Sequence, residues 1–157
     1  MKAKVFIPEQ RVGIWLDHEH AFIFQINEQH QYEMNTILSG IDEKEQSFAG
    51  KKISRFKRMF FNQDKEQRRR HQRLLKFFEN IIHQVRNADY IYLFGPGNLK
   101  HELNHFIEKA GKRFALKVIA IDTADKMTAP QMVVQVKDYF KSLSFQDAQR
   151  QLSLREF

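Results

Sequence analysis

The residues with the clearest chemical character are lysines and arginines crowded into residues 51–76. This segment has eleven of them and two acids, a formal charge of +9, whereas the rest of the chain has 15 basic and 17 acidic residues. Ammonium and guanidinium groups at this density bind phosphates, so the segment has the composition of a nucleic-acid-binding surface. We assign the interleaved Phe56, Phe60 and Phe61 to a core beneath the loop rather than to base stacking. The candidate contacts, including one further lysine at 100, are Lys51, Lys52, Arg55, Lys57, Arg58, Lys65, Arg68, Arg69, Arg70, Arg73 and Lys100.

That further lysine follows the turn Gly95-Pro96-Gly97, which separates an apolar run from a helical pattern. Backbone N–H groups at a helix start bind anions, so the turn could hold a phosphate with help from Lys100. It lacks the length and the Gly-Lys-Ser/Thr ending of a P-loop. We therefore interpret it first as a structural turn, with Asn98 as the N-cap of the next helix.

The next helix carries a formal zinc-protease motif, H-E-x-x-H, at His101, Glu102 and His105. That chemistry needs both histidines on the metal and the glutamate as base. At about 100° per residue, the histidines lie nearly opposite the apolar face of Leu99 and Leu103. We expect them to face solvent and predict neither a metal site nor a cofactor.

A metal-dependent nuclease would need clustered carboxylates. Asp17 ends the first predicted strand, but the neighbouring strand ends in Phe94 and Gly95 without an acid, and Asp122 lies one strand further out. Because this cluster is incomplete, we interpret Asp17 as a turn residue that hydrogen-bonds the backbone. A nuclease centred on Asp17 remains an alternative function.

Hydrophobic periodicity predicts the elements that position these groups. Antiparallel strands are expected at residues 11–17, 21–26 and 31–38, followed by a loop, a helix at 64–86, a strand at 89–94, a helix at 98–110, a strand at 114–121 and a helix from 128. We predict an α/β domain with a mixed five-stranded sheet, three antiparallel strands and then αβαβα. This order is typical of ribonuclease H-like folds, in which the first strand neighbours the fourth.

Length and composition limit the domain organisation and the cellular compartment that we expect. The 157 residues predict a single domain at 1–143 and a C-terminal tail at 144–157. The sequence has no cysteine, and its N-terminus shows no signal peptide or membrane-spanning run. We expect a cytoplasmic protein with no membrane partner.

Four stretches resemble a known family. They are Val12-Gly13-Ile14-Trp15-Leu16-Asp17 with Ala21-Phe22-Ile23, then Ser54-Arg55-Phe56-Lys57-Arg58, Gly95-Pro96-Gly97-Asn98-Leu99-Lys100 and Val118-Ile119-Ala120-Ile121-Asp122. In order and spacing they resemble the middle domain of the eukaryotic and archaeal peptide-chain release factor, its relative Pelota and scattered bacterial relatives. The resemblance implies a factor that acts on the ribosome.

The resemblance ends at the family's catalytic tripeptide. Release factors carry Gly-Gly-Gln before the Arg-Phe segment and use it in peptidyl-tRNA hydrolysis, whereas the matching positions here are Ala49-Gly50-Lys51. A lysine cannot supply the glutamine amide, so hydrolysis of that kind is not expected. Pelota also lacks the tripeptide. The resemblance thus implies a non-enzymatic translation factor that binds ribosomal RNA or tRNA through the basic loop and helix start, with the ribosome or structured RNA as partner.

A third interpretation needs no RNA. The basic face could instead meet an acidic protein, which would make the chain a protein-interaction module with incidental RNA binding. The sequence alone does not choose between these partners.

Overall fold

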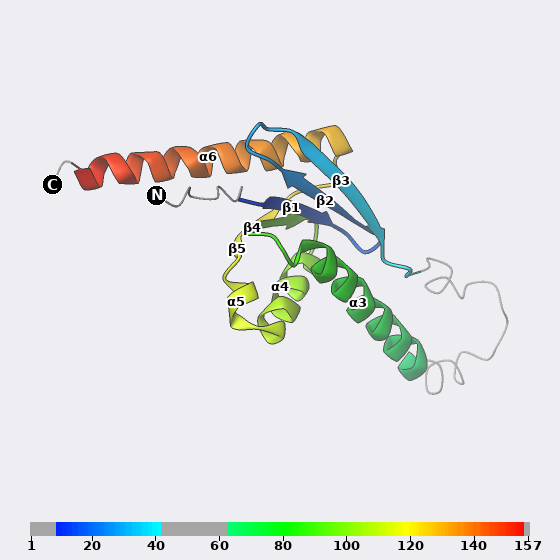
Figure 1. Cartoon of the computed structure of the whole chain (residues 1–157). Helices are drawn as coiled ribbons and strands as arrows, with labels where there is room; N and C mark the ends of the chain where they lie inside the picture. The colour runs from blue at the N-terminus through cyan, green and yellow to red at the C-terminus, as the bar shows by residue number, and fades with distance from the viewer. Residues whose placement is uncertain (1–8, 42–62, 156–157) are drawn as a thin grey trace.

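The computed structural model describes residues 9–41 and 63–155 and places a mixed five-stranded sheet at the centre of the fold (Figure 1). The strands are β1 (Arg11–Leu16), β2 (His20–Ile26), β3 (Tyr32–Leu38), β4 (Tyr90–Gly95) and β5 (Val118–Thr123). Their order across the sheet is β3-β2-β1-β4-β5. The first three strands pair antiparallel, and β4 pairs parallel with both β1 and β5. The first strand therefore neighbours the fourth, as the predicted topology requires.

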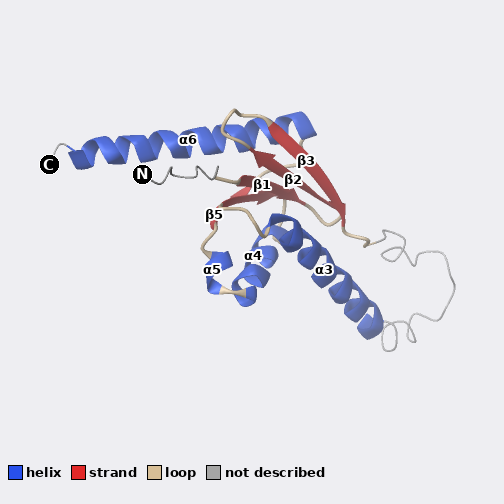
Figure 2. Cartoon of the chain, viewed as in Figure 1, coloured by secondary structure: helices blue, strands red, loops and turns tan. Residues whose placement is uncertain are grey.

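Helices cover both faces of the sheet (Figure 2). One face packs against α3 (Gln63–Val85) and α4 (Leu99–Ala110), and the other packs against α6 (Ala129–Arg155). Alternation along β1 supplies both cores, because Ile14 and Leu16 join the α3 and α4 side whereas Trp15 joins the α6 side. The predicted α/β architecture is confirmed.

The long helix begins and ends within one residue of its predicted bounds. Its apolar stripe is buried at Phe78, Ile81 and Val85, and Phe77 beside it is buried as well. Exposed residues dominate the first two turns of α3, where no sheet lies beneath them. These turns project beyond the core, and Figure 1 shows the start of α3 pointing away from the sheet.

The predicted strand at 114–121 is wrong at its beginning. A short helix, α5 (Lys112–Ala115), stands there, and β5 begins only at Val118. Val118 is the first β5 residue that pairs with β4, opposite Ile91, and the Lys117 carbonyl just before it accepts the Ile91 N–H at 2.7 Å. The N–H groups of residues 115–117 bond locally instead, with the Ala115 N–H donating to the Gly111 carbonyl at 3.1 Å.

The starts of α4 and α6 are capped differently. Asn98 is the N-cap residue of α4, as predicted, but its side chain makes no capping hydrogen bond. At the start of α6 a reciprocal pair exists. The Thr128 N–H donates to Gln131 Oε1 at 3.0 Å, and the Gln131 N–H donates to Thr128 Oγ1 at 3.4 Å. This capping box satisfies two backbone donors that the helix itself leaves open.

Helix α6 continues past the last core residue of its apolar stripe, Leu143. The residues predicted as a tail are helical as far as Arg155, and Figure 1 shows this part of α6 running beyond the edge of the sheet. Phe145 and Leu152 are mostly exposed there. None of the helices in the described ranges combines the length and apolarity that a bilayer crossing requires.

Candidate nucleic-acid interface

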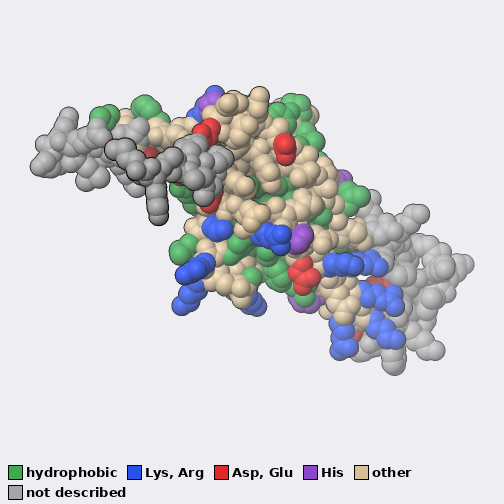
Figure 3. Space-filling model, in the orientation of Figure 1, with side chains coloured by type: hydrophobic (Ala, Val, Ile, Leu, Met, Phe, Trp, Pro, Cys, Tyr) green, Lys and Arg blue, Asp and Glu red, His purple; other side chains and the backbone are tan. Residues whose placement is uncertain are grey.

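The exposed start of α3 carries the densest positive charge in the described residues. Lys65, Arg68, Arg69 and Arg70 are all exposed within two turns of this helix. Within residues 9–41 and 63–155, no acidic side chain forms an ion pair with any of these four. Figure 3 shows lysine and arginine side chains gathered over this end of α3. The four side chains can therefore meet a polyanion without first breaking an ion pair to any described residue.

Basic residues at a helix start oppose the helix dipole, but the arrangement of charges in α3 reduces this cost. The first turn of α3 contains Asp64 and Glu66, and the three arginines begin only at Arg68. Acids in the first turn compensate the positive end of the helix dipole, whose effect fades beyond that turn. The helix thus keeps its start stable while presenting the three arginines one turn later, and Lys65 is the one cation of the four that lies in the first turn, between the two acids.

The other candidate cations on this part of the chain are not included in this exposed group, for two reasons. Lys51, Lys52, Arg55, Lys57 and Arg58 lie outside the described residues, so their role stays a prediction. Arg73 is half-buried on α3 and is engaged with another group. For these reasons Lys65, Arg68, Arg69 and Arg70 define what we call the α3 basic surface.

Lys100 does not belong to the surface of the molecule. Its side chain is 1% exposed, and its Nζ donates a hydrogen bond to the Gly97 carbonyl oxygen. Lys100 therefore secures the Gly-Pro-Gly turn from within, and a phosphate could not reach its ammonium in this conformation. We leave it out of the α3 basic surface.

The H-E-x-x-H residues are exposed, as predicted. His101 and His105 both face solvent, and His105 Nδ1 lies 3.7 Å from Glu108 Oε2. Glu108 also accepts a hydrogen bond from the Asn104 amide at 3.3 Å. Across the described part of the chain, no three histidine or carboxylate side chains converge in a way that could hold a metal ion.

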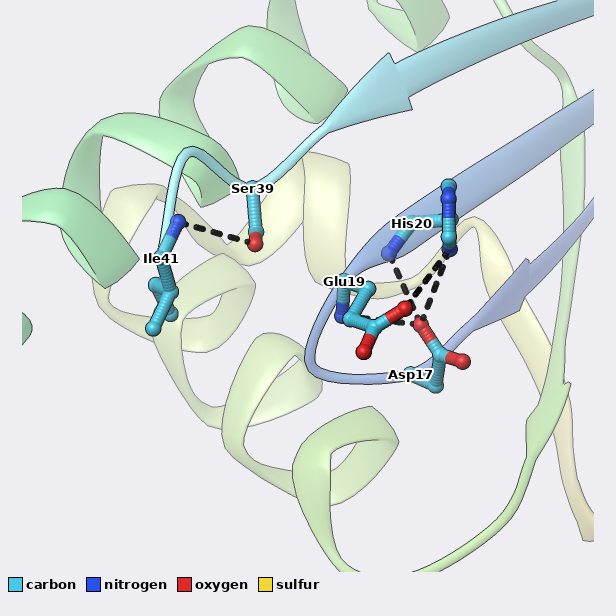
Figure 4. A network of polar contacts seen from close by, with 5 residues as sticks. All are labelled: Asp17, Glu19, His20, Ser39 and Ile41. Atoms are coloured by element: carbon cyan, nitrogen blue, oxygen red, sulfur yellow. Dashed lines mark hydrogen bonds and ion pairs between the residues drawn. The ribbon is translucent and has the colours of Figure 1, made fainter. Parts of the chain in front are cut away.

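Asp17 holds the turn between β1 and β2 (Figure 4). Its Oδ1 accepts the backbone N–H of Glu19 at 2.9 Å and that of His20 at 2.7 Å, and the His20 ring nitrogen Nδ1 lies 3.7 Å away. This is an Asx turn, in which a short carboxylate substitutes for a backbone acceptor. The prediction that Asp17 is a turn residue is confirmed.

Asp122, the other carboxylate considered for a nuclease, belongs to a polar network under α6. The Tyr92 hydroxyl donates to Asp122 Oδ2 at 2.7 Å and accepts from the Gln135 amide at 3.0 Å. The Tyr92 ring stacks on Tyr139 with 4.1 Å between ring centroids. Burial, assisted by the Asp122 carboxylate, raises the pKa of Tyr92 to about 12. The hydroxyl therefore stays protonated and fixes strand β4 to α6.

A pocket beside the α3 basic surface was not foreseen from the sequence. It opens between the β1–β2 turn, one face of α3 and the start of α4. Its polar lining comprises His18, Gln67, Arg70, His71 and Glu102. Only spatial proximity joins these residues, since they come from three separate elements and form no sequence motif.

The sequence matches no protein-family model, and no curated protein matches it. Solved structures with a similar backbone include the Pelota protein of Thermoplasma acidophilum (TM-score 0.48, 18% identity, covering 78% of this chain and 30% of that one). Archaeoglobus fulgidus Pelota (TM-score 0.46, 10% identity) matches over 94% of this chain and 40% of its own. An archaeal translation termination factor, aRF1 (TM-score 0.41, 11% identity), matches over 90% and 42%.

This chain thus spans well under half the length of each of these three proteins. Fewer than one in five residues is shared with any of them, so the likeness describes the backbone arrangement alone.

Proposed function

We propose that this protein is a translation-associated factor that binds ribosomal RNA or tRNA through the α3 basic surface and performs no chemical step itself. The observation that carries the proposal is the placement of Lys65, Arg68, Arg69 and Arg70 on two exposed helical turns without acidic partners in the described ranges. A rigid helix presents these charges at fixed spacing, which suits the regular phosphates of a folded RNA.

The sequence resemblance directs this RNA binding toward translation. The Gly-Pro-Gly turn and the strand segments resemble the release-factor middle domain, whereas Ala49-Gly50-Lys51 stands where that family has its catalytic tripeptide. A protein with the frame but not the tripeptide would bind the ribosome or tRNA without releasing the peptide. The roles of the two described carboxylates support this, since Asp17 holds a turn and Asp122 binds a tyrosine.

The test replaces Arg68, Arg69 and Arg70 together by alanine and measures RNA affinity across a range of salt concentrations. Each phosphate contact contributes a slope of about 0.7 to 0.9 in a plot of log affinity against log salt. We expect weaker binding and a slope reduced by about two to three. Unchanged affinity and slope would remove the α3 basic surface from the account.

A matched control removes three other exposed cations. Lys109, Lys112 and Arg113 lie at the end of α4 and in α5, away from the start of α3. Replacing these three by alanine makes the same change in net charge, so it tests whether position or total charge matters. We expect the control triple variant to keep most of the wild-type salt slope.

Ribosome co-sedimentation at low and high salt then tests the translation partner. Salt-sensitive co-migration with ribosomes or one subunit, reduced in the α3 triple variant, is the expected result. RNA binding in solution combined with absence from every ribosomal fraction at low salt would contradict the ribosomal part of the proposal.

A further inference from the structure

The pocket beside the α3 basic surface has a volume of about 240 Å³. Gln67, Arg70 and His71 reach it from one face of α3, since they are spaced by three and four residues. His18 contributes from the turn after β1, and Glu102 from the first turn of α4. The pocket therefore lies beside the carboxyl end of β1, whose parallel partner β4 leads into α4. In α/β sheets this is the region where ligands bind.

The pocket lining contains one permanently charged cation, Arg70, and one carboxylate, Glu102. Arg70 presents a guanidinium, which binds phosphate oxygens in a bidentate manner, and His71 adds a ring nitrogen beside it. Glu102 is an acceptor and repels a bare phosphate. A matching ligand must therefore carry a negative group for Arg70 and a hydrogen-bond donor for Glu102.

Arg70, His71 and Glu102 do not bond to one another. In the described part of the chain, their side chains form no hydrogen bond or ion pair with another group. All three are exposed and line the pocket. Ile41 and Leu74, which are half-buried, form its apolar part. The polar groups can therefore turn toward a ligand that enters.

We propose that this pocket holds one ribose-phosphate unit of RNA, with its phosphate on Arg70 and a ribose hydroxyl donating to Glu102. The inference rests on the proposed function, because Arg70 belongs both to the α3 basic surface and to the pocket. A strand bound along that surface is thereby led to the pocket. The volume is below the roughly 300 to 1,000 Å³ typical of drug-sized ligand sites, which suits a sugar-phosphate unit rather than a duplex.

The proposal gives the protein a means to distinguish RNA from DNA. The 2′-hydroxyl is the donor that DNA lacks, so only RNA satisfies the Glu102 carboxylate. DNA leaves that carboxylate facing the sugar-phosphate backbone without a donor. Preference for RNA should therefore depend on this one acidic side chain.

The experiment measures fluorescence anisotropy of the full chain with a labelled single-stranded RNA 12-mer and the DNA of the same sequence. We expect the wild type to bind RNA about tenfold more tightly than DNA, the range of one hydrogen bond to a charged group. Glu102→Ala removes the acceptor and should bring the two affinities to within about threefold of each other. Glu108→Ala is the matched control, since it makes the same truncation and the same charge change on the same helix outside the pocket lining.

The outcomes separate this inference from the proposed function. Equal wild-type affinity for RNA and DNA, or equal loss of preference in both alanine variants, overturns the pocket assignment and leaves RNA binding by the α3 basic surface intact. Failure of the wild type to bind either oligonucleotide overturns the pocket assignment, whereas the proposed function is tested separately by the salt titration and by ribosome co-sedimentation of the α3 triple variant. Loss of preference in Glu102→Ala alone supports the assignment.

Discussion

Gly95 lies so close to Leu16 that a Cβ atom built on the glycine would come within 2.4 Å of the Leu16 carbonyl oxygen. The two residues end the neighbouring parallel strands β4 and β1. Gly95 also has a φ of +144°, a conformation that side-chain-bearing residues avoid. The absence of a side chain here allows the two strand ends to close beside the Gly-Pro-Gly turn.

Replacing Gly95 by alanine should therefore destabilise the protein by about 3 kcal/mol or more, since both backbone strain and a backbone clash result. Urea unfolding followed by fluorescence measures this, because Trp15 is the single tryptophan and is 3% exposed. Gly97→Ala is the control. Its φ is +64°, but a Cβ there meets nothing within 4 Å, so we expect a loss of about 1 to 2 kcal/mol. Equal losses would show that strain alone matters.

Gly13 performs a related role on the other face of the sheet. A Cβ on Gly13 would lie 2.4 Å from Val136 Cγ2 and 2.6 Å from Cγ1, so α6 packs directly on the β1 backbone. Gly13→Ala should cost about 1 to 3 kcal/mol through overpacking. In the double variant with Val136→Ala the new methyl fills the space of the removed ones, and the combined loss should fall short of the sum by at least about 1 kcal/mol.

The control for this pair is Val133→Ala. Val133 is also buried on α6 but is not among the nearest atoms to Gly13. Its loss should add to that of Gly13→Ala, and urea unfolding of all variants provides the comparison. Coupling of similar size with Val133 would contradict a local contact between Gly13 and Val136.

These glycines illustrate which parts of the fold the sequence could predict. The strands and α3 follow from local periodicity, because residues such as Ile14 and Ile81 repeat at the spacing of a buried face. Gly13 carries no comparable local signal, and at Gly95 the Gly-Pro-Gly sequence indicates a turn but not the close approach to Leu16. Their importance depends on Val136 and Leu16, which the folded chain brings to them from other elements.

Side-chain environment was harder to predict than secondary structure. The exposure of Lys65 and Arg68–Arg70 could be foreseen because no apolar residue accompanies them in the first turns of α3. Lys100 looked equally basic in sequence, but its ammonium lies against the Gly97 carbonyl. The lining of the pocket, from His18 to Glu102, depends on how a turn and two helices meet, which periodicity does not encode.

Substitutions at Asp17 can distinguish a structural role of this carboxylate from a catalytic one, because its Asx turn needs only a hydrogen-bond acceptor. Asp17→Asn keeps the Oδ1 acceptor for the Glu19 and His20 N–H groups, so stability should change by less than about 0.5 kcal/mol. Asp17→Ala removes both hydrogen bonds and should cost about 1 to 2 kcal/mol. Urea unfolding measures the two losses.

The same two variants test the nuclease alternative. Incubation of labelled RNA with Mg²⁺ or Mn²⁺ should show no protein-dependent cleavage by the wild type or by Asp17→Asn. Cleavage by the wild type that disappears in the equally stable asparagine variant would instead make Asp17 a metal ligand in a working site.

The raised pKa of Tyr92 predicts how the stability of the fold depends on pH in the alkaline range. Because its pKa rises from 10 in the unfolded chain to about 12 in the fold, chiefly through burial, the protonated hydroxyl is favoured in the native state. This stabilising contribution is fully present below pH 10 and is lost as the pH rises through 12. The total loss of stability is about 2 to 3 kcal/mol. Tyr92→Phe should cost about 1 to 2 kcal/mol at pH 8, where two hydrogen bonds disappear, and less at pH 11.

Urea unfolding followed by far-UV circular dichroism at pH 8, 10 and 11 measures this difference. Tyr139, whose pKa burial also raises, is present in both proteins, so the comparison isolates Tyr92. Tyr32→Phe serves as the control, because Tyr32 is about half exposed on the edge strand β3 and does not join the network under α6. If the wild type and Tyr92→Phe lost stability in parallel between pH 8 and 11, the Tyr92 hydroxyl would not be the group that fixes β4 to α6.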